Sequence, residues 1–180
     1  MKKILLLMLP ASLLFACNNE PATSETSKSD STSTTQSENV SLPYTVEQTP
    51  DWERGDNANV AVAMNALRAY EVNDINAFKQ YLADTVEFYA DNFIFKGSKD
   101  TLSKLLGDWR NQTDSLRINM RDYESVKSKG RGEEWVGLWY TEVNTSKGKT
   151  DSMMVMDDIR IVNGKVVVID SKMRRITKGM

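Results

Sequence analysis

The sequence contains no histidine and a single cysteine, Cys17, among its 180 residues. Histidine is the side chain whose ordinary pKa lies nearest neutral pH, so acid–base chemistry here needs a carboxyl or amino group with a strongly shifted pKa. One cysteine cannot form an intrachain disulfide or a thiolate cluster around a metal ion. Gly-rich phosphate loops and Ser/His/Asp arrangements are lacking as well. The sequence therefore predicts neither a cofactor nor a metal site.

An excess of basic residues is also lacking. The chain has 23 Lys and Arg against 25 Asp and Glu. Acidic residues predominate over residues 18–50, and from Asp51 onward the two signs are equal in number. A nucleic-acid-binding domain normally shows a basic stripe or patch, so nucleic acid is not an expected partner.

The N-terminus has the composition of a targeting segment. Lys2 and Lys3 precede an apolar run over residues 4–15, which is too short to span a bilayer and is typical of a secretory signal. Residues 14–17, Leu-Phe-Ala-Cys, resemble the lipobox of bacterial lipoproteins, in which the cysteine is lipidated and becomes the mature N-terminus. The resemblance implies that residues 1–16 are removed and that Cys17 anchors the protein in a lipid bilayer of the bacterial cell envelope, in the outer membrane. The alternative is an ordinary signal peptide followed by an unmodified thiol.

Residues 17–50 are expected to form a flexible tether. Residues 21–39 include 11 Ser or Thr, and such a segment cannot bury enough apolar area to offset the entropy of ordering. About 30 residues of this kind have an r.m.s. reach of roughly 30 Å, enough to hold a domain clear of a lipid surface. The remainder, residues 51–180, has an ordinary size for one domain.

Hydrophobic periodicity in residues 51–180 predicts helices first and long strands last. Three helices are expected, capped at their N-termini by Asp56, by the pair Asn73-Asp74 and by Ser98. Short strands are expected at residues 85–90 and 93–95. Four long strands follow, at 115–126, 134–143, 151–162 and 165–175, with a bulge before Tyr123 and a tight turn at Asn163-Gly164. This order favours an α+β domain with helices on one face of a curved antiparallel sheet.

The long strands are apolar on both faces. Alternation places Val136, Leu138 and Tyr140 on one face and Trp135 and Trp139 on the other. In the last strand it places Val166 and Val168 opposite Val167 and Ile169. A sheet with one face in water would not show this pattern, so we expect helices on one face and a second subunit on the other, forming a homodimer.

Three stretches resemble a known group of proteins. They are Asn73–Ile75 with Leu82–Phe88, then Phe95–Asp100, then Met156–Val166. They resemble the SnoaL-like group of the nuclear transport factor 2-like superfamily, which includes ketosteroid isomerase, and the resemblance covers residues 52–176. It implies a cone-like curved antiparallel sheet that wraps around three N-terminal helices and encloses a pocket, in proteins that often form dimers through the outer sheet face.

The chemistry of ketosteroid isomerase does not carry over. That enzyme uses an aspartate base and an oxyanion hole made of a tyrosine and a protonated aspartate. The resemblance places these three positions on Tyr89, near Ala66 and on Asp157, so only the last is retained. SnoaL-type cyclases and related dehydratases use histidine, which this chain lacks.

Asp157 is the leading candidate for a functional side chain. Alternation places it on the apolar face of its strand, where desolvation raises the pKa of a carboxyl group. One alternative is that a neighbouring hydroxyl, Lys172 or Arg174 forms a hydrogen bond or an ion pair with the Asp157 carboxylate. Another is that Asp157 lies at the entrance of a pocket, in contact with water. Asp170 and Lys172 share a face of the last strand and are expected to form a structural ion pair.

Five aromatic residues are candidates for lining a pocket for a flat apolar ligand: Trp109, Trp135, Trp139, Phe93 and Phe95. Core or dimer packing is the alternative for each. The favoured function is non-catalytic binding of a small apolar or amphipathic molecule, or of a protein partner. One alternative is an isomerase, dehydratase or hydrolase with Asp157 as proton donor and Tyr89 as a pocket hydroxyl. Another is a structural envelope module whose cone is filled by its own side chains.

Overall fold

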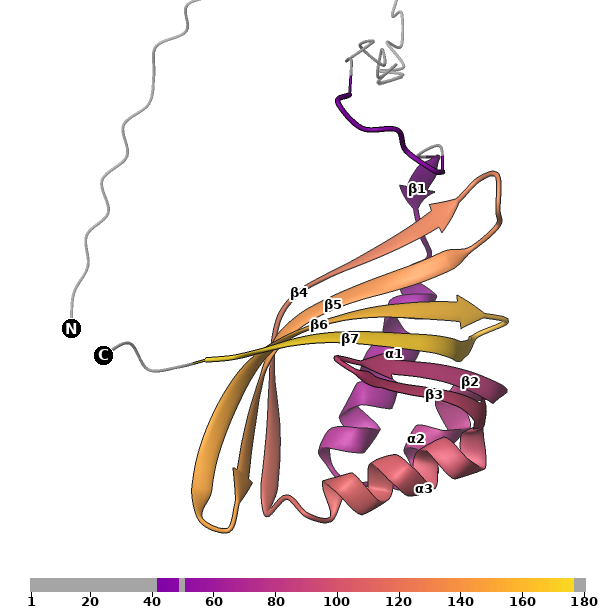
Figure 1. Cartoon of the computed structure of the whole chain (residues 1–180). Helices are drawn as coiled ribbons and strands as arrows, with labels where there is room; N and C mark the ends of the chain where they lie inside the picture. The colour runs from indigo at the N-terminus through magenta and orange to yellow at the C-terminus, as the bar shows by residue number, and fades with distance from the viewer. Residues whose placement is uncertain (1–41, 49–50, 177–180) are drawn as a thin grey trace, which may run out of the picture. The chain divides into compact units, whose positions relative to one another are not determined.

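The computed structural model describes residues 42–48 and 51–176 (Figure 1). The expected signal segment, Cys17 and most of the expected tether lie outside these residues. The chain divides into two compact units, Met1–Thr45 and Val46–Met180. The described part of the first unit, residues 42–45, contains neither helix nor strand. No helix in the described ranges is long and apolar enough to cross a membrane.

The second unit is an α+β domain, as the sequence predicts. Its described residues form three helices and one seven-stranded sheet. Two helices follow the first strand, the third follows the third strand, and the last four strands are consecutive. The helices are α1 (Asn57–Glu71), α2 (Ile75–Tyr81) and α3 (Lys99–Arg110). The strands are β1 (Trp52–Arg54), β2 (Leu82–Ala90), β3 (Phe93–Ser98), β4 (Ser115–Ser128), β5 (Glu134–Ser146), β6 (Lys149–Val162) and β7 (Lys165–Arg175).

The helices begin at the three predicted caps. Asp56 accepts a hydrogen bond from the Ala58 N–H at 2.8 Å, and Asp74 accepts one from the Ala77 N–H at 2.9 Å. Ser98 Oγ accepts one from the Thr101 N–H at 3.2 Å. Each contact satisfies a backbone donor of the first turn that has no partner within the helix. The helix starts follow directly from local sequence.

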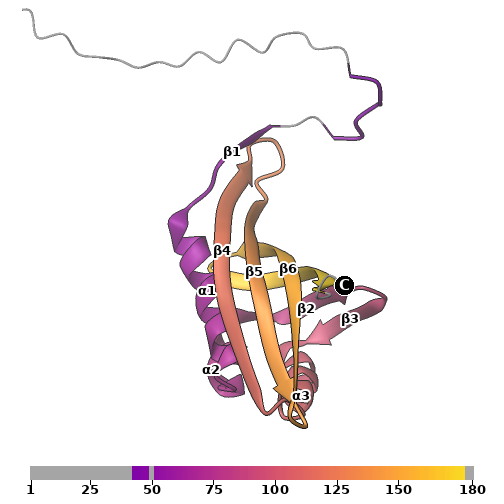
Figure 2. The same ribbon diagram turned by 90° about the vertical axis from the view of Figure 1, so that its left-hand side faces the viewer.

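The sheet has the strand order β1-β4-β5-β6-β7-β2-β3. β4, β5 and β6 run side by side as long bent strands, and the sheet curves around the helices (Figures 1 and 2). Every neighbouring pair is antiparallel except β2 and β7, which are parallel. The expectation of an antiparallel sheet is therefore wrong for this pair. Parallel pairing is open to β2 and β7 because α3 and intervening strands separate them along the chain.

Two bulges interrupt the alternation of the long strands. The register of β4 on β5 shifts between Met120 and Asp122, which leaves Arg121 as the extra residue and confirms the predicted bulge. A second shift places Ile161 opposite Val166 and Arg160 opposite Val168, so Val167 is extra in β7. Both Val166 and Ile169 are buried as a result. Their predicted placement on opposite faces is wrong because the sequence gives no sign of this bulge.

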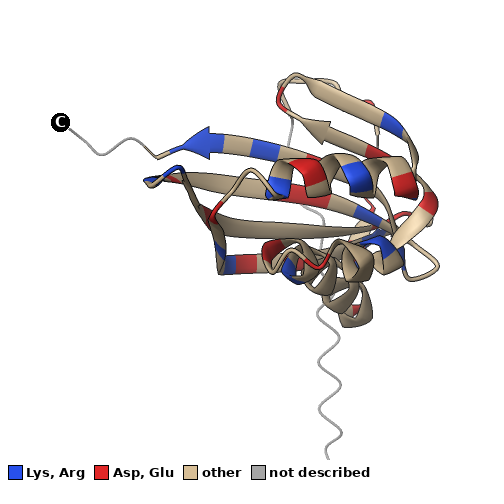
Figure 3. Cartoon of the chain, turned by 90° about the horizontal axis from the view of Figure 1, so that it is seen from below, with Lys and Arg blue, Asp and Glu red and all other residues tan. Residues whose placement is uncertain are grey.

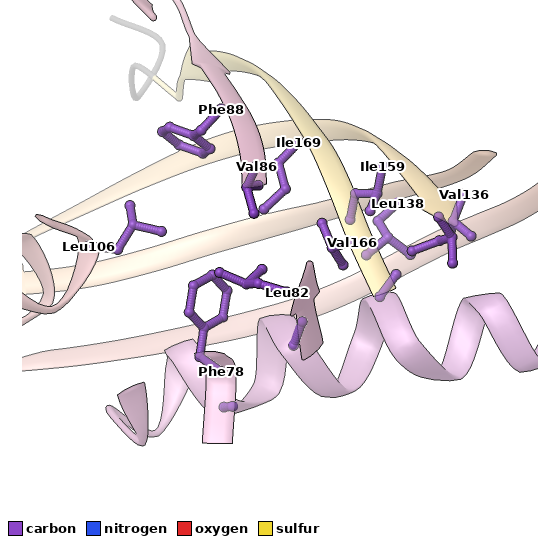
Figure 4. Packing of buried hydrophobic residues seen from close by; sticks show 14 of the residues in the cluster. Phe78, Leu82, Val86, Phe88, Leu106, Val136, Leu138, Ile159, Val166 and Ile169 are labelled. Carbon is purple, nitrogen blue, oxygen red and sulfur yellow. The ribbon is translucent and has the colours of Figure 1, made fainter. Parts of the chain in front are cut away.

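The core lies between the helices and the inner face of the sheet. Side chains from both layers meet there, as Figure 4 shows for Phe78, Leu82, Val86, Phe88, Leu106, Val136, Leu138, Ile159, Val166 and Ile169. The Asn163-Gly164 turn has positive φ angles of 50° and 69°, which is the predicted tight hairpin. On the outer face, Trp135 and Trp139 are half-buried. The homodimer through this face stays a prediction.

A matched pair of valines tests the assignment of faces. Val136 is 0 % exposed and Val162, at the end of β6, is 40 % exposed. Val136→Ala should lower the free energy of unfolding by about 2 kcal/mol, because it removes buried methyl groups and leaves a cavity. Val162→Ala should change it by less than about 0.5 kcal/mol. Urea unfolding measures both, and equal losses would contradict the assignment.

Candidate ligand cavity

A cavity of about 180 Å³ lies between the inner face of the sheet and the helices. Its walls come from α1, α2, α3, β2, β5, β6 and β7. Most of the lining is apolar: Ala63, Ala66, Leu67, Phe78, Phe88, Ala90, Leu106, Val155, Ile159, Val166, Ile169 and Met173. Small residues on α1 leave this space open, since Ala63 and Ala66 face the sheet with only a methyl group each. The cone is therefore not filled by its own side chains.

Asp157 supplies a deeply buried carboxyl group to the wall. It lies in the middle of β6, directly opposite Leu138 of β5 and Ser171 of β7, and is 4 % exposed. Tyr140 Oη donates a hydrogen bond to Asp157 Oδ2 at 2.8 Å, and Ser171 Oγ donates one to Oδ1 at 2.6 Å. The predicted alternation and the alternative of a hydroxyl-satisfied carboxylate are both correct.

Burial raises the pKa of Asp157 to about 6. Desolvation disfavours the charged form and raises the pKa. The hydrogen bonds from the two hydroxyls favour the charged form and so limit the rise in pKa. The neighbouring basic residues do not contribute a contact. Lys172 lies on the other face, where it donates to Asp158 at 2.7 Å and to Asp170 at 2.9 Å. This is the ion pair that the sequence predicts for Asp170.

A second carboxyl group, Glu142, lines the same cavity two residues beyond Tyr140. Burial raises its pKa, while a hydrogen bond from Asn144 and the charge of Arg110 act in the opposite direction. Burial, followed by the charge of Glu142, raises the pKa of the adjacent Tyr70 to about 12. The cavity thus carries two carboxyl groups with raised pKa values and two tyrosine hydroxyls that stay protonated at neutral pH.

Arg110 fixes a positive charge near this end of the cavity. It is buried, and its Nε and Nη2 atoms donate to the carbonyl of Glu71 at 3.3 and 3.1 Å. Its Nη1 atom donates to the carbonyl of Thr113 at 2.9 Å. Because three backbone contacts hold the guanidinium, it acts as a fixed charge that joins the ends of α1 and α3.

The structure places one of the five predicted aromatic residues, Trp109, in the cavity wall. This side chain is 38 % exposed, so it lies at the mouth. Phe93 does not line the cavity but packs edge-on against Trp109, with ring centroids 5.0 Å apart. Phe95 packs partly buried against the core and lies opposite Phe88 in the β2–β3 register. Phe93 therefore supports Trp109, and the expectation that Phe93 and Phe95 line the cavity is wrong.

The other three predicted pocket residues lie elsewhere. Tyr89 is on the opposite face of β2 from Phe88 and Ala90; its hydroxyl donates to Glu87, and Lys96 Nζ lies 5.6 Å from its ring centroid. Trp135 and Trp139 are on the outer face of β5, because Val136 and Tyr140 take the inner positions. The structure corrects the expectation that these three side chains line the cavity.

Four residues at the cavity are not among those expected from the sequence: Tyr70, Tyr140, Glu142 and Ser171. The alternation of β5 places Tyr140 and Glu142 on the face of Leu138, so the sequence pattern alone is enough to predict that these two side chains face the core. Ser171 could not be found in the same way, since it meets Asp157 only through the β6–β7 register. Within the described residues no group of three or more acidic or cysteine side chains is placed to hold a metal ion.

Comparisons with known proteins identify the fold. No family model matches the chain, and none of the curated proteins matches its sequence. Among solved structures, the chain is similar to an LEH-like epoxide hydrolase of M. tuberculosis, with a TM-score of 0.56 and 12 % identity over 66 % of this chain and 84 % of the other.

Two further structures are similar to the same degree. A nuclear transport factor 2-like protein of unknown function from Burkholderia pseudomallei has a TM-score of 0.55 and 13 % identity over 65 % of this chain and 91 % of its own. A candidate ketosteroid isomerase from Kribbella flavida has a TM-score of 0.53 and 10 % identity over 71 % of this chain and 85 % of its own. The chain therefore has the cone-like fold of the nuclear transport factor 2-like superfamily.

Proposed function

We propose that this domain binds a small, uncharged and largely apolar molecule in the cavity without transforming it. The observation that carries the proposal is an open apolar cavity with a hydroxyl-held carboxyl group, Asp157, in its inner wall. Specific ligand pockets are usually apolar with a few convergent polar groups, and this cavity has that composition.

The size of the cavity limits the ligand. A cavity of about 150 Å³ accommodates one benzene ring, and this cavity measures about 180 Å³. A molecule with one ring or a short branched chain fits, and a larger one has to extend past Trp109 at the mouth.

The charge of the wall favours a neutral ligand. Asp157 and Glu142 both face the cavity, so an anionic ligand would be repelled and would lose its hydration on entry. A carboxylate oxygen that accepts one hydrogen bond retains a second acceptor site. A ligand hydroxyl or amide N–H directed at Asp157 would use that site.

A second candidate function is an enzyme with Asp157 as proton donor. One observation favours it: the pKa of Asp157 is raised to about 6, so a fraction of the carboxyl groups carries a proton at neutral pH. The pocket hydroxyl in this version is Tyr140 rather than Tyr89. Substrate turnover that disappears in Asp157→Asn would support the enzyme and contradict the binding-only proposal.

We also propose that the protein is lipid-anchored in the bacterial cell envelope through Cys17. The support is the lipobox-like sequence alone.

Filling the cavity tests the binding proposal. Ala66 lines the cavity on α1, whereas Ala61 lies on the exposed side of the same helix. Calorimetric titration with 4-ethylphenol, a neutral single-ring probe, should show binding to the wild type. Ala66→Leu should weaken that binding by roughly tenfold or more, because the new side chain occupies the space of the ring. The same substitution at Ala61 is the matched control, and equal effects at both positions would contradict the proposed site.

The titration of Asp157 predicts a pH dependence of stability. Because its pKa is raised from 3.8 to about 6 on folding, the folded chain holds this proton more tightly than the unfolded chain does. Its contribution to the unfolding free energy is therefore largest below pH 4 and is lost as pH rises through 6. Relative to Asp157→Asn, which cannot titrate, the wild type should lose on the order of 2–3 kcal/mol between pH 4 and pH 7.5.

Urea unfolding of both proteins at the two pH values gives this difference. Asp158→Asn, on the outer face of the same strand, is the control. It keeps Asp157, so its unfolding free energy should fall between the two pH values as that of the wild type does. The contrary outcome is that the unfolding free energies of the wild type and of Asp157→Asn differ by the same amount at both pH values. That result would show that Asp157 is not desolvated in the folded chain.

Replacement of Cys17 tests the anchor. Cys17→Ser removes the only thiol, so cells that express it should incorporate no labelled palmitate into the protein, and the protein should leave the membrane fraction. Ser24→Ala, in the expected tether, should behave as the wild type. A wild-type protein without label would contradict the lipidation.

A further inference from the structure

A groove of about 550 Å³ lies on the outer face of the sheet. Trp139, Met154 and Met156 form its apolar floor, and Arg121, Lys172 and Arg174 lie along its sides. β5 and β6 separate the groove from the cavity, and only Tyr140 and Val155 belong to both linings. The groove is therefore a second concave surface, distinct from the proposed cavity site.

Two guanidinium groups converge over the floor of this groove. Arg174 Nη2 lies 2.8 Å from the sulfur of Met154, and Arg121 Nη1 lies 3.9 Å from the same atom. The two nitrogen atoms cannot be farther apart than the sum of these distances. A thioether sulfur is only a weak acceptor, so it does not compensate two like charges held side by side.

Neither guanidinium pairs with a carboxylate within the part of the chain that the structure describes. Among the described residues, no Asp or Glu oxygen lies within 4.0 Å of Arg121 or Arg174, although the neighbouring Arg175 pairs with Asp151 at 3.0 Å. The bulge in β4 makes Arg121 the unpaired extra residue of that strand. Figure 3 shows the basic segments near the end of β7.

Two other charged residues line the groove. Lys172 is shared between Asp158 and Asp170, at 2.7 and 2.9 Å. Asp122 lines the groove, and its Oδ1 atom accepts a hydrogen bond from the Tyr123 N–H at 2.8 Å. Asp122 forms no ion pair among the described residues, so the groove holds two unpaired arginines against one unpaired carboxylate.

We propose that this groove binds an aliphatic carboxylate, with the carboxylate between Arg121 and Arg174 and the chain on the apolar floor. One carboxylate can direct an oxygen to each guanidinium at charge-assisted hydrogen-bond distances of about 2.7–2.9 Å. The flexible methionine side chains adapt to an alkyl chain, and Trp139 adds a flat apolar surface. The two faces of the sheet thus take different classes of ligand. The cavity on the inner face repels anions, and the groove on the outer face attracts them.

The test uses decanoate and decanol as probes with the full-length protein, in calorimetric titrations at low salt. Decanoate should bind the wild type. In Ala66→Leu, whose cavity is filled, decanol, which has the same chain without the charge, should bind at least tenfold more weakly than decanoate. The double variant Arg121→Gln/Arg174→Gln should weaken decanoate binding by roughly tenfold or more, because it removes charge-assisted hydrogen bonds. Added salt should weaken decanoate binding as well.

Two control variants distinguish binding in the groove from a general effect of surface charge and from binding in the cavity. Arg117→Gln removes an exposed arginine of the same strand that does not line the groove, and it should leave decanoate binding unchanged. Ala66→Leu fills the cavity on the other face and should also leave it unchanged. Three results would overturn the proposal. Decanoate does not bind the wild type, or its binding is lost in Ala66→Leu, or its binding falls equally in Arg117→Gln and in the double variant.

Discussion

The structure depends on how the buried carboxyl group of Asp157 is satisfied. A carboxyl group in an apolar interior is costly unless hydrogen bonds replace its water. Here the two donors come from the strands on either side, Tyr140 on β5 and Ser171 on β7. The contacts fix the register of three central strands at the point where the sheet faces the helices. The same group gives an otherwise apolar cavity its polar end.

Strand alternation then assigns different chemistry to the two faces of the sheet. Inner positions hold the cavity wall and the carboxyl groups that disfavour anions. Outer positions hold exposed ion pairs, such as Lys172 with Asp158, and the groove with its converging arginines. The bulge at Arg121 matters because an extra residue in β4 escapes strict pairing. A fold known to accommodate many functions thus carries two concave surfaces with different charged groups, carboxyl groups in the cavity and two unpaired arginines in the groove.

Local signals predict much of this molecule. The three N-caps and the Asn163-Gly164 turn depend on neighbouring residues only, and the position of Asp157 follows from alternation within one strand. The expectation for Tyr89 is wrong because the resemblance assigns only a position along the chain, whereas the alternation of β2 turns Phe88 to the core and Tyr89 to the other face. The parallel pairing of β2 with β7 and the contact of Ser171 with Asp157 are set by tertiary register, which no short stretch of sequence encodes.

The central claim is that Asp157 is a desolvated carboxyl group held by two hydroxyls. A ¹³C NMR titration of its carboxyl carbon tests this directly, in the wild type and in Tyr140→Phe. We expect a pKa near 6 in the wild type and a higher pKa in the variant, because the lost hydroxyl stabilises the charged form. A wild-type pKa near the ordinary aspartate value, unchanged by Tyr140→Phe, would contradict the account.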